Sequence, residues 1–154
     1  MSPKPKLQRI LDVIATRLES IAMEFDYFTN MGLKIWRDQR PPQADSLPCC
    51  MVYLETRTAE SQQCAATRCT MLINVIGYAE RIDPAEDLGI QMLADIQRAV
   101  ELEDDTLGGL LRGQFGLAFV SEEIFMPEVG ANAVGARVTY SAPNVRLYGD
   151  PEIS

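Results

Sequence analysis

Two amphipathic stripes, each typical of a helix, set the strongest limits on the fold of this chain. Across residues 7–22, apolar side chains recur every three or four positions, which puts them on one face of a helix. The second stripe follows Asp83-Pro84, an acidic capping residue and a proline that suits the first helical position, and it ends near Leu102. Strands and loops must therefore occupy the rest of the sequence.

Segments rich in β-branched and aromatic residues lie on both sides of the second stripe and are read as strands. Polar residues 59–66 separate two of them, which predicts a hairpin with a protruding arm. This order predicts an α/β domain of the α+β type: a mostly antiparallel mixed sheet of about five strands, with two main helices packed on one face. The predicted strands span residues 33–36, 49–58, 67–79, 115–123 and 134–141, with a further short strand at 144–148.

The length of 154 residues corresponds to one ordinary domain, and no linker, repeat or low-complexity tract divides it. We therefore expect a single domain over residues 1–154, with flexible ends at 1–6 and 149–154. No apolar run reaches the roughly 18–20 residues of a membrane span, and the basic start lacks the apolar core of a signal peptide. These features predict a soluble protein that stays in the cytoplasm and has no membrane partner.

The net charge of −8 argues against ordinary nucleic-acid binding, because an acidic surface repels phosphate backbones. Three acids, Glu103, Asp104 and Asp105, follow the second predicted helix, where they oppose the helix macrodipole. The stability of the helix does not explain these acids, so they are candidates for a functional role at the protein surface. An acidic lining would suit a protein past which DNA has to slide.

No catalytic, cofactor or metal site is predicted, since the chain contains no histidine and therefore no histidine-based triad or metal motif. The glycine-rich segments 107–110 and 130–135 lack the lysine of a phosphate loop and the spacing of a dinucleotide fingerprint. The cysteines are best explained as buried, reduced thiols, because adjacent Cys49 and Cys50 point to opposite faces of a strand.

Acidic residues leave one enzymatic alternative open. Glu122 and Glu123 are neighbours on a predicted strand, so their side chains point to opposite faces and make a poor acid–base couple. A small enzyme with a carboxylate-based site would need acids that converge in a pocket, near Glu122 or Asp95. We expect a protein that is not an enzyme and keep this enzyme as the alternative.

Two pairs of side chains are candidates for subunit or partner contacts. Arg57 and Arg68 lie on the two sides of the first hairpin, where they face acids across a subunit boundary, pair with Glu55 or stay solvated. Phe125 and Met126 crowd a hairpin tip, which marks either a contact surface or a loop folded back over its own core.

The segment Asp45–Glu55 contains an acidic residue, an apolar-proline step and a short apolar strand that ends in Val-Tyr-Leu. It resembles the start of the core hairpin in tail terminator proteins of lambda-like, long-tailed bacteriophages. The strand Thr70–Tyr78, the Asp83-Pro84 helix and the closing strand Gly135–Tyr140 follow in the same order. The resemblance covers most of the chain, from about Leu7 to Tyr140, whereas residues 141–154 depart from the lambda-type pattern.

This resemblance implies a structural virion protein that forms a ring, as a hexamer, on the end of a finished tail tube. The ring would stop polymerisation of the tube and offer the surface on which the head docks. Implied partners are further copies of the chain, the tail tube protein and the head–tail connector protein, with DNA only as cargo in the channel. The arm 59–66 and the loop at Phe125-Met126 would make contacts, and Glu103, Asp104 and Asp105 would line the channel.

The location implied is the bacterial host cytoplasm during assembly, for a phage or a prophage, and then the virion tail. One alternative within the same class is another head–tail joining, neck or baseplate protein, which would share this size and composition. The out-of-class alternative is the small carboxylate-based enzyme.

Overall fold

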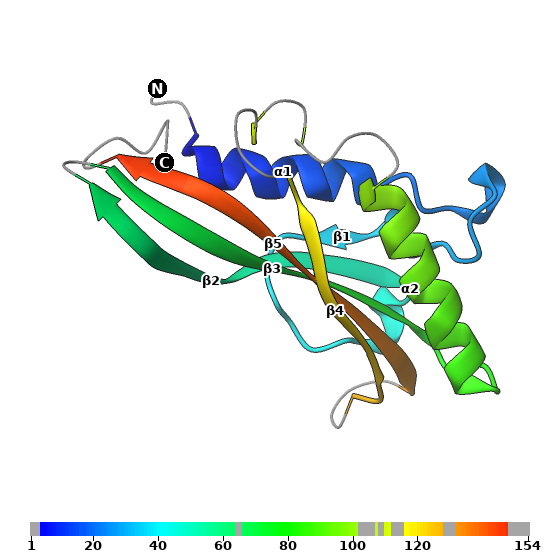
Figure 1. Ribbon diagram of the computed structural model, residues 1–154. Coiled ribbons are helices and arrows are strands. Elements are labelled where there is room, and N and C mark those ends of the chain that lie inside the picture. Colours follow the sequence, from blue (N-terminus) through cyan, green and yellow to red (C-terminus); the bar gives the residue numbers. More distant parts are fainter. Residues whose placement is uncertain are drawn as a thin grey trace.

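The strands form one five-stranded sheet in the order β1-β2-β3-β5-β4, and both helices pack on the same face of it (Figure 1). The structure is a computed structural model that describes residues 4–63, 66–101, 107, 110–111, 116–127 and 132–147. The elements are α1 (Lys6–Leu18), η1 (Met23–Phe25), η2 (Met31–Leu33), β1 (Ile35–Trp36), η3 (Ala44–Ser46), β2 (Cys49–Gln63), β3 (Ala66–Glu80), α2 (Ala85–Glu101), β4 (Ala118–Phe125) and β5 (Ala133–Leu147).

The observed order confirms the predicted α+β fold. β1 pairs with β2 in parallel, and the pairs β2–β3, β3–β5 and β4–β5 are antiparallel. β1 is the short edge strand expected near Trp36, although it covers only two residues. Among the described helices, none combines the length and hydropathy needed to cross a bilayer.

The predicted hairpin is present, but its strands are longer than expected, because Ala59–Gln63 continue β2 and Ala66 already begins β3. Residues 144–147 likewise continue β5 and do not form a separate strand. The ladder between β2 and β3 continues through two irregularities, after Leu54 and Ala59, up to the pair Gln63 and Ala66. The arm is thus a hydrogen-bonded ribbon, and it reaches past the start of α1 (Figure 1).

The main core lies between the helices and the sheet. Each helix contributes its predicted apolar stripe, and alternate residues of β2, β3 and β5 face these stripes because side chains alternate across a strand. α1 ends at Leu18, four residues before the predicted end, yet Ile21 is still buried in this core. Further fully buried members are Ile10, Ile14, Val52, Ile73, Val75, Met92, Ile96, Val138 and Tyr140.

Polar side chains fasten the helices to their neighbours. Asp95 of α2 is 1 % exposed, and its carboxylate accepts hydrogen bonds from the backbone N–H groups of Phe28 and Thr29 at 3.0 and 2.8 Å. Arg17 of α1 donates to the carbonyl of Val100 at 2.8 Å. These bonds hold α2 against the connection after α1 and against α1 itself.

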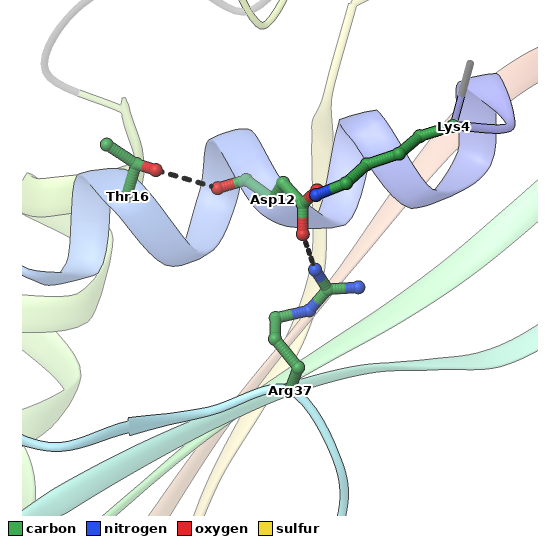
Figure 2. Close-up of polar contacts among 4 residues, drawn as sticks. All are labelled: Lys4, Asp12, Thr16 and Arg37. Atoms are coloured by element: carbon green, nitrogen blue, oxygen red, sulfur yellow. Dashed lines mark hydrogen bonds and ion pairs between the residues drawn. The ribbon is translucent and has the colours of Figure 1, made fainter. Parts of the chain in front are cut away.

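Asp12 ties α1 to the segment that follows β1. Its carboxylate accepts Nζ of Lys4 at 3.0 Å and the guanidinium of Arg37, which reaches up from below α1 (Figure 2). Thr16 bonds the Asp12 carbonyl at 2.9 Å within the helix. The carboxylate at the middle of α1 therefore joins the segment before the helix to the segment after β1.

Of the chain ends expected to be flexible, residues 1–3 and 149–154 lie outside the described residues. Lys6, by contrast, is already the first residue of α1.

Candidate functional site

The sheet face turned away from the helices carries a polar pocket of about 290 Å³. It lies beside a small apolar cluster formed by Cys49, Met51, Ile76 and Tyr78 on the same face. The strands β2, β3, β5 and β4 all contribute to the pocket, because their register brings polar positions of all four strands together. The pocket is lined by Glu55, Asn74, Ser121, Glu122, Glu123, Arg137 and Thr139.

A hydrogen-bonded row of three side chains crosses this face between β2 and β5. Thr139 donates to the Oδ1 atom of Asn74 at 2.8 Å, and the amide of Asn74 donates to the hydroxyl of Tyr53 at 3.4 Å. Asn74 is 3 % exposed and Thr139 is 9 % exposed. These groups satisfy each other's hydrogen-bonding capacity, which offsets the cost of burying them. The hydrogen bonds also fix the floor of the pocket.

This row was not predicted from the sequence. The signal for it is Asn74 itself, a polar residue inside the otherwise apolar run Leu72–Ile76, since a buried amide requires a partner. The partner lies 65 residues away on β5, so only the strand register identifies it.

The neighbouring acids Glu122 and Glu123 bond to different partners. The carboxylate of Glu123 pairs with Arg137, its neighbour on β5, while that of Glu122 accepts a hydrogen bond from Gln97 of α2 on the helix-covered side. The prediction that Glu122 and Glu123 point to opposite faces is confirmed. Glu55 is exposed on the pocket side of β2. Among the described residues, the pocket therefore offers the carboxylate of Glu55 without an ion pair and the Glu123–Arg137 pair.

The predicted pair at the hairpin tip divides into two roles. Phe125 packs edge-on against Tyr78, with ring centroids 5.8 Å apart, and its ring fills the space that a side chain at position 135 would need. Phe125 thus folds back over the apolar cluster of its own sheet. Met126, by contrast, is 45 % exposed and remains a candidate for contact with another molecule.

Arg57 and Arg68 lie on opposite faces of the ribbon and are not brought together. Arg57 pairs in register with Met71, a core residue on the helix side, whereas Arg68 is exposed and pairs with Ser61. The Nε and Nη2 atoms of Arg57 are buried without a hydrogen-bond partner in the described part of the chain. The alternative in which Glu55 pairs with Arg57 is not observed there.

The sheet has two free edges. β4 is exposed along six of its eight residues, and Phe119 and Val120 on it are each 49 % exposed. Beside β1 runs a groove of about 650 Å³, in which the guanidinium of Arg40 stacks 3.9 Å above the ring of Trp36. Edge strands present unpaired backbone groups and are ready sites for association.

The remaining predicted residues give no reactive centre within the described ranges. Glu103, Asp104 and Asp105, proposed for the channel, lie outside them. No group of three potential metal ligands occurs among the side chains that are described. Cys49, Cys50 and Cys69 are free and buried, and burial raises the pKa of the Cys50 thiol well above its ordinary value.

The described geometry comprises exposed sheet edges, a polar pocket on one sheet face and a groove beside β1. Comparison with known proteins adds no functional residue to it. No protein-family model matches the chain, and no curated protein matches it significantly.

Proposed function

We propose that this chain is a structural assembly protein that works as a ring, as its resemblance to phage tail terminators implies. The ring would cap the tail tube, stop its polymerisation and provide the surface on which the head docks. The observation that carries the proposal is the ribbon formed by the distal parts of β2, β3 and β5, which extends past α1 (Figure 1).

The ribbon extends beyond the core, so its stability needs an explanation. In β2, the residues Glu55, Thr56 and Thr58–Ser61 are exposed, so they add little to the core of their own subunit. Even a three-stranded ribbon needs a hydrophobic face or a packed partner to be stable in water. A neighbouring subunit that covers the ribbon would supply the missing contacts.

A cyclic ring also requires two different surfaces on each subunit, one of which fits the other on the next copy. The ribbon gives one surface. The exposed edge of β4 with Phe119 and Val120, together with Met126, supplies apolar area elsewhere on the molecule. The net charge of −8 suits a ring through which DNA passes without sticking.

The direct test is to add the purified chain to polymerising tail tubes and to measure tube length by negative-stain electron microscopy. Tubes of arrested length with added density at one end are the expected result. Tubes that continue to grow in a molar excess of the chain would contradict the proposal. Labelled chain found at the neck or baseplate would instead favour the alternative of another joining protein.

The polar pocket supports a second candidate, the small carboxylate-based enzyme, because Glu55 and Glu123 line it together with Arg137. The geometry favours it less, since Glu123 is paired with Arg137, which leaves Glu55 as the base among the pocket residues that the structure describes. A screen of hydrolase substrates with the native chain and with Glu55→Gln tests it. Turnover that disappears in Glu55→Gln would establish the enzyme.

A further inference from the structure

The sheet ends in two open edges, one along β1 and one along β4. Within the described residues, β1 pairs only with β2 and β4 pairs only with β5, so the outer side of each strand has no partner strand. Unpaired backbone groups of this kind are templates for a further strand. Four strand spacings of about 4.8 Å separate the edges by roughly 19 Å, so one chain cannot join its own edges.

The two edges lie at the same level of the sheet. The pairing register forms one row across all five strands, from Trp36 through Met51, Ile76 and Arg137 to Glu123. A cyclic ring is closed by rotation alone. When the rotation axis runs along the strands, the row continues from one copy to the next, and Glu123 of one copy lies beside Trp36 of its neighbour.

The strand directions also suit this junction. β1 is parallel to β2, whereas three successive antiparallel pairs lead from β2 to β4. β1 and β4 therefore run in opposite directions, and copies related by such a rotation meet in an antiparallel pair. Antiparallel pairs are slightly more stable per residue than parallel ones. The contact between β4 and β1 thus uses the more stable of the two kinds of ladder.

Exposed apolar side chains lie at matching positions of the two edges. Leu33 precedes Trp36 by three residues and Met126 follows Glu123 by three, so the continued row brings Leu33 of one copy beside Met126 of the next. These side chains are 69 % and 45 % exposed. Leu33 also lines the groove beside β1, together with Trp36 and Pro41. Because β1 covers only two residues, this groove supplies contact area that its backbone cannot.

Charge distinguishes the two edges. β4 carries Glu122 and Glu123 and no base, a net charge of −2. Residues 33–46, which contain β1 and its groove, carry three bases and two acids, a net charge of +1. Lys34 of the groove forms no ion pair with the described residues, and its Nζ atom donates to the carbonyl of Asp45 at 2.7 Å. Two β4 edges placed together would oppose four carboxylates, so unlike edges are favoured over like ones.

We infer that the β4 edge of one copy pairs with the β1 edge of the next copy, where Glu123 becomes the diagonal neighbour of Lys34. Diagonal neighbours on paired strands are within reach of long side chains. The contact joins two different edges, so it is heterologous and repeats into a closed ring or an open filament. The inference deepens the proposed ring function and rests on it.

The first test exchanges the two charges in the full chain. Lys34→Glu alone and Glu123→Lys alone should each weaken self-association about tenfold, because like charges then meet across the contact. The double variant should recover the native association, since every contact again joins one charge of each sign. Native mass spectrometry and light scattering over a concentration series measure the association, with and without tail tubes. A double variant as weak as the single ones would overturn the pairing of Lys34 with Glu123.

Matched controls separate this contact from general electrostatics. Glu122→Lys makes the same change on the opposite face of β4, and Arg68→Glu reverses an exposed cation of the ribbon. Both should associate like the native chain, and an equal loss in both would overturn the assignment. Circular dichroism verifies folding. If Glu123→Lys does not fold because it faces Arg137, Glu123→Gln replaces it and should still weaken association.

The second test is a disulfide across the contact. A chain with Leu33→Cys and Met126→Cys should give a ladder of covalent oligomers on a non-reducing gel after mild oxidation. Each single variant should remain monomeric on the same gel, because its new cysteine meets no second one. Absence of the ladder under conditions in which the native chain assembles would overturn the inference. A covalent dimer of Met126→Cys alone would assign a contact between two β4 edges and overturn it as well.

Failure of this inference is distinguishable from failure of the ring proposal. If the native chain assembles but neither the charge exchange nor the disulfide succeeds, the edge contact is wrong and the ring stands. If the native chain assembles neither alone nor on tubes, the proposed function itself is wrong. If Lys34→Glu abolishes binding to tail tubes while self-association is unchanged, the groove binds the tube protein and not a second copy.

Discussion

At the residue scale, Asp95 shows how a buried charge is made compatible with the core. Its carboxylate accepts two backbone N–H groups and the hydroxyl of Thr29, the last at 2.7 Å, so its oxygens are satisfied by donors alone. Charge-assisted bonds of this kind are among the stronger polar contacts in proteins. They attach α2 to the connection between α1 and β1, and this is a structural role for Asp95.

Asp95→Asn should destabilise the fold by about 2–4 kcal/mol, because the amide replaces an acceptor with a donor in front of N–H groups. The free energy of unfolding in urea measures the effect. The matched control is Asp87→Asn on the exposed face of the same helix, which should change it by less than about 0.5 kcal/mol. Equal effects of the two substitutions would show that the Asp95 bonds contribute nothing specific.

At the element scale, tertiary contacts decide where the helix and strands end. The apolar period of α1 continues to Ile21, but the helix stops at Leu18 because the chain at Gly32 packs directly against its end. Gly32 donates to the carbonyl of Ile21 at 2.8 Å. The sequence predicted the buried stripe correctly and the helix end incorrectly, since the contact comes from a segment that the local pattern does not identify.

The end of β2 in the ribbon likewise depends on contacts that are distant in the sequence. Local sequence predicted β2 only as far as Thr58, because a strand with both faces in water lacks the alternation of apolar and polar residues. Its continuation depends on pairing with β3, which in turn pairs with β5. The pocket could not be predicted for the same reason, since its residues come from four strands and meet only through the register.

Gly32→Ala should destabilise the fold more than Gly77→Ala. A Cβ atom at position 32 would lie 2.5 Å from the backbone carbonyl oxygen of Leu18, which cannot move without distorting α1. A Cβ atom at position 77 would lie 2.4 Å from the sulfur of Met31, the end of a flexible side chain that is able to shift. Overpacking costs about 1–3 kcal/mol or more in rigid surroundings. Urea denaturation of both variants checks the order, and the reverse order would contradict the helix-end packing.

At the scale of the whole molecule, the protein is an elongated sheet with different surfaces at its two ends. The helices cover one face, the other face carries the polar pocket, and the ribbon and the start of α2 lie at opposite ends (Figure 1). The order of the predicted elements indicated the class of this fold, whereas the ribbon and the pocket depend on which strands pair. The proposed ring follows from these two separate surfaces and from the resemblance to tail terminators.

Reversing the proposed channel acids, Glu103, Asp104 and Asp105, to lysine should slow DNA ejection or alter assembly, because fixed positive charge in a channel would hold phosphate groups. The measurement is the rate of DNA release from purified particles that carry the variant. Reversal of Glu24, an exposed acid of η1, to lysine is the control and should leave release unchanged. An identical rate of DNA release in both variants would show that these acids do not line the channel.

The central claim is that the chain functions by self-association, and its mass in solution tests this most directly. Native mass spectrometry, with light scattering over a concentration series, should show one closed oligomer of defined size, a hexamer, either for the purified chain or after its addition to tail tubes. Assembly that requires a tube as template also supports the claim, because a modest interface does not always overcome the entropy of association. A chain that stays monomeric at high concentration and fails to assemble on tubes would contradict the account.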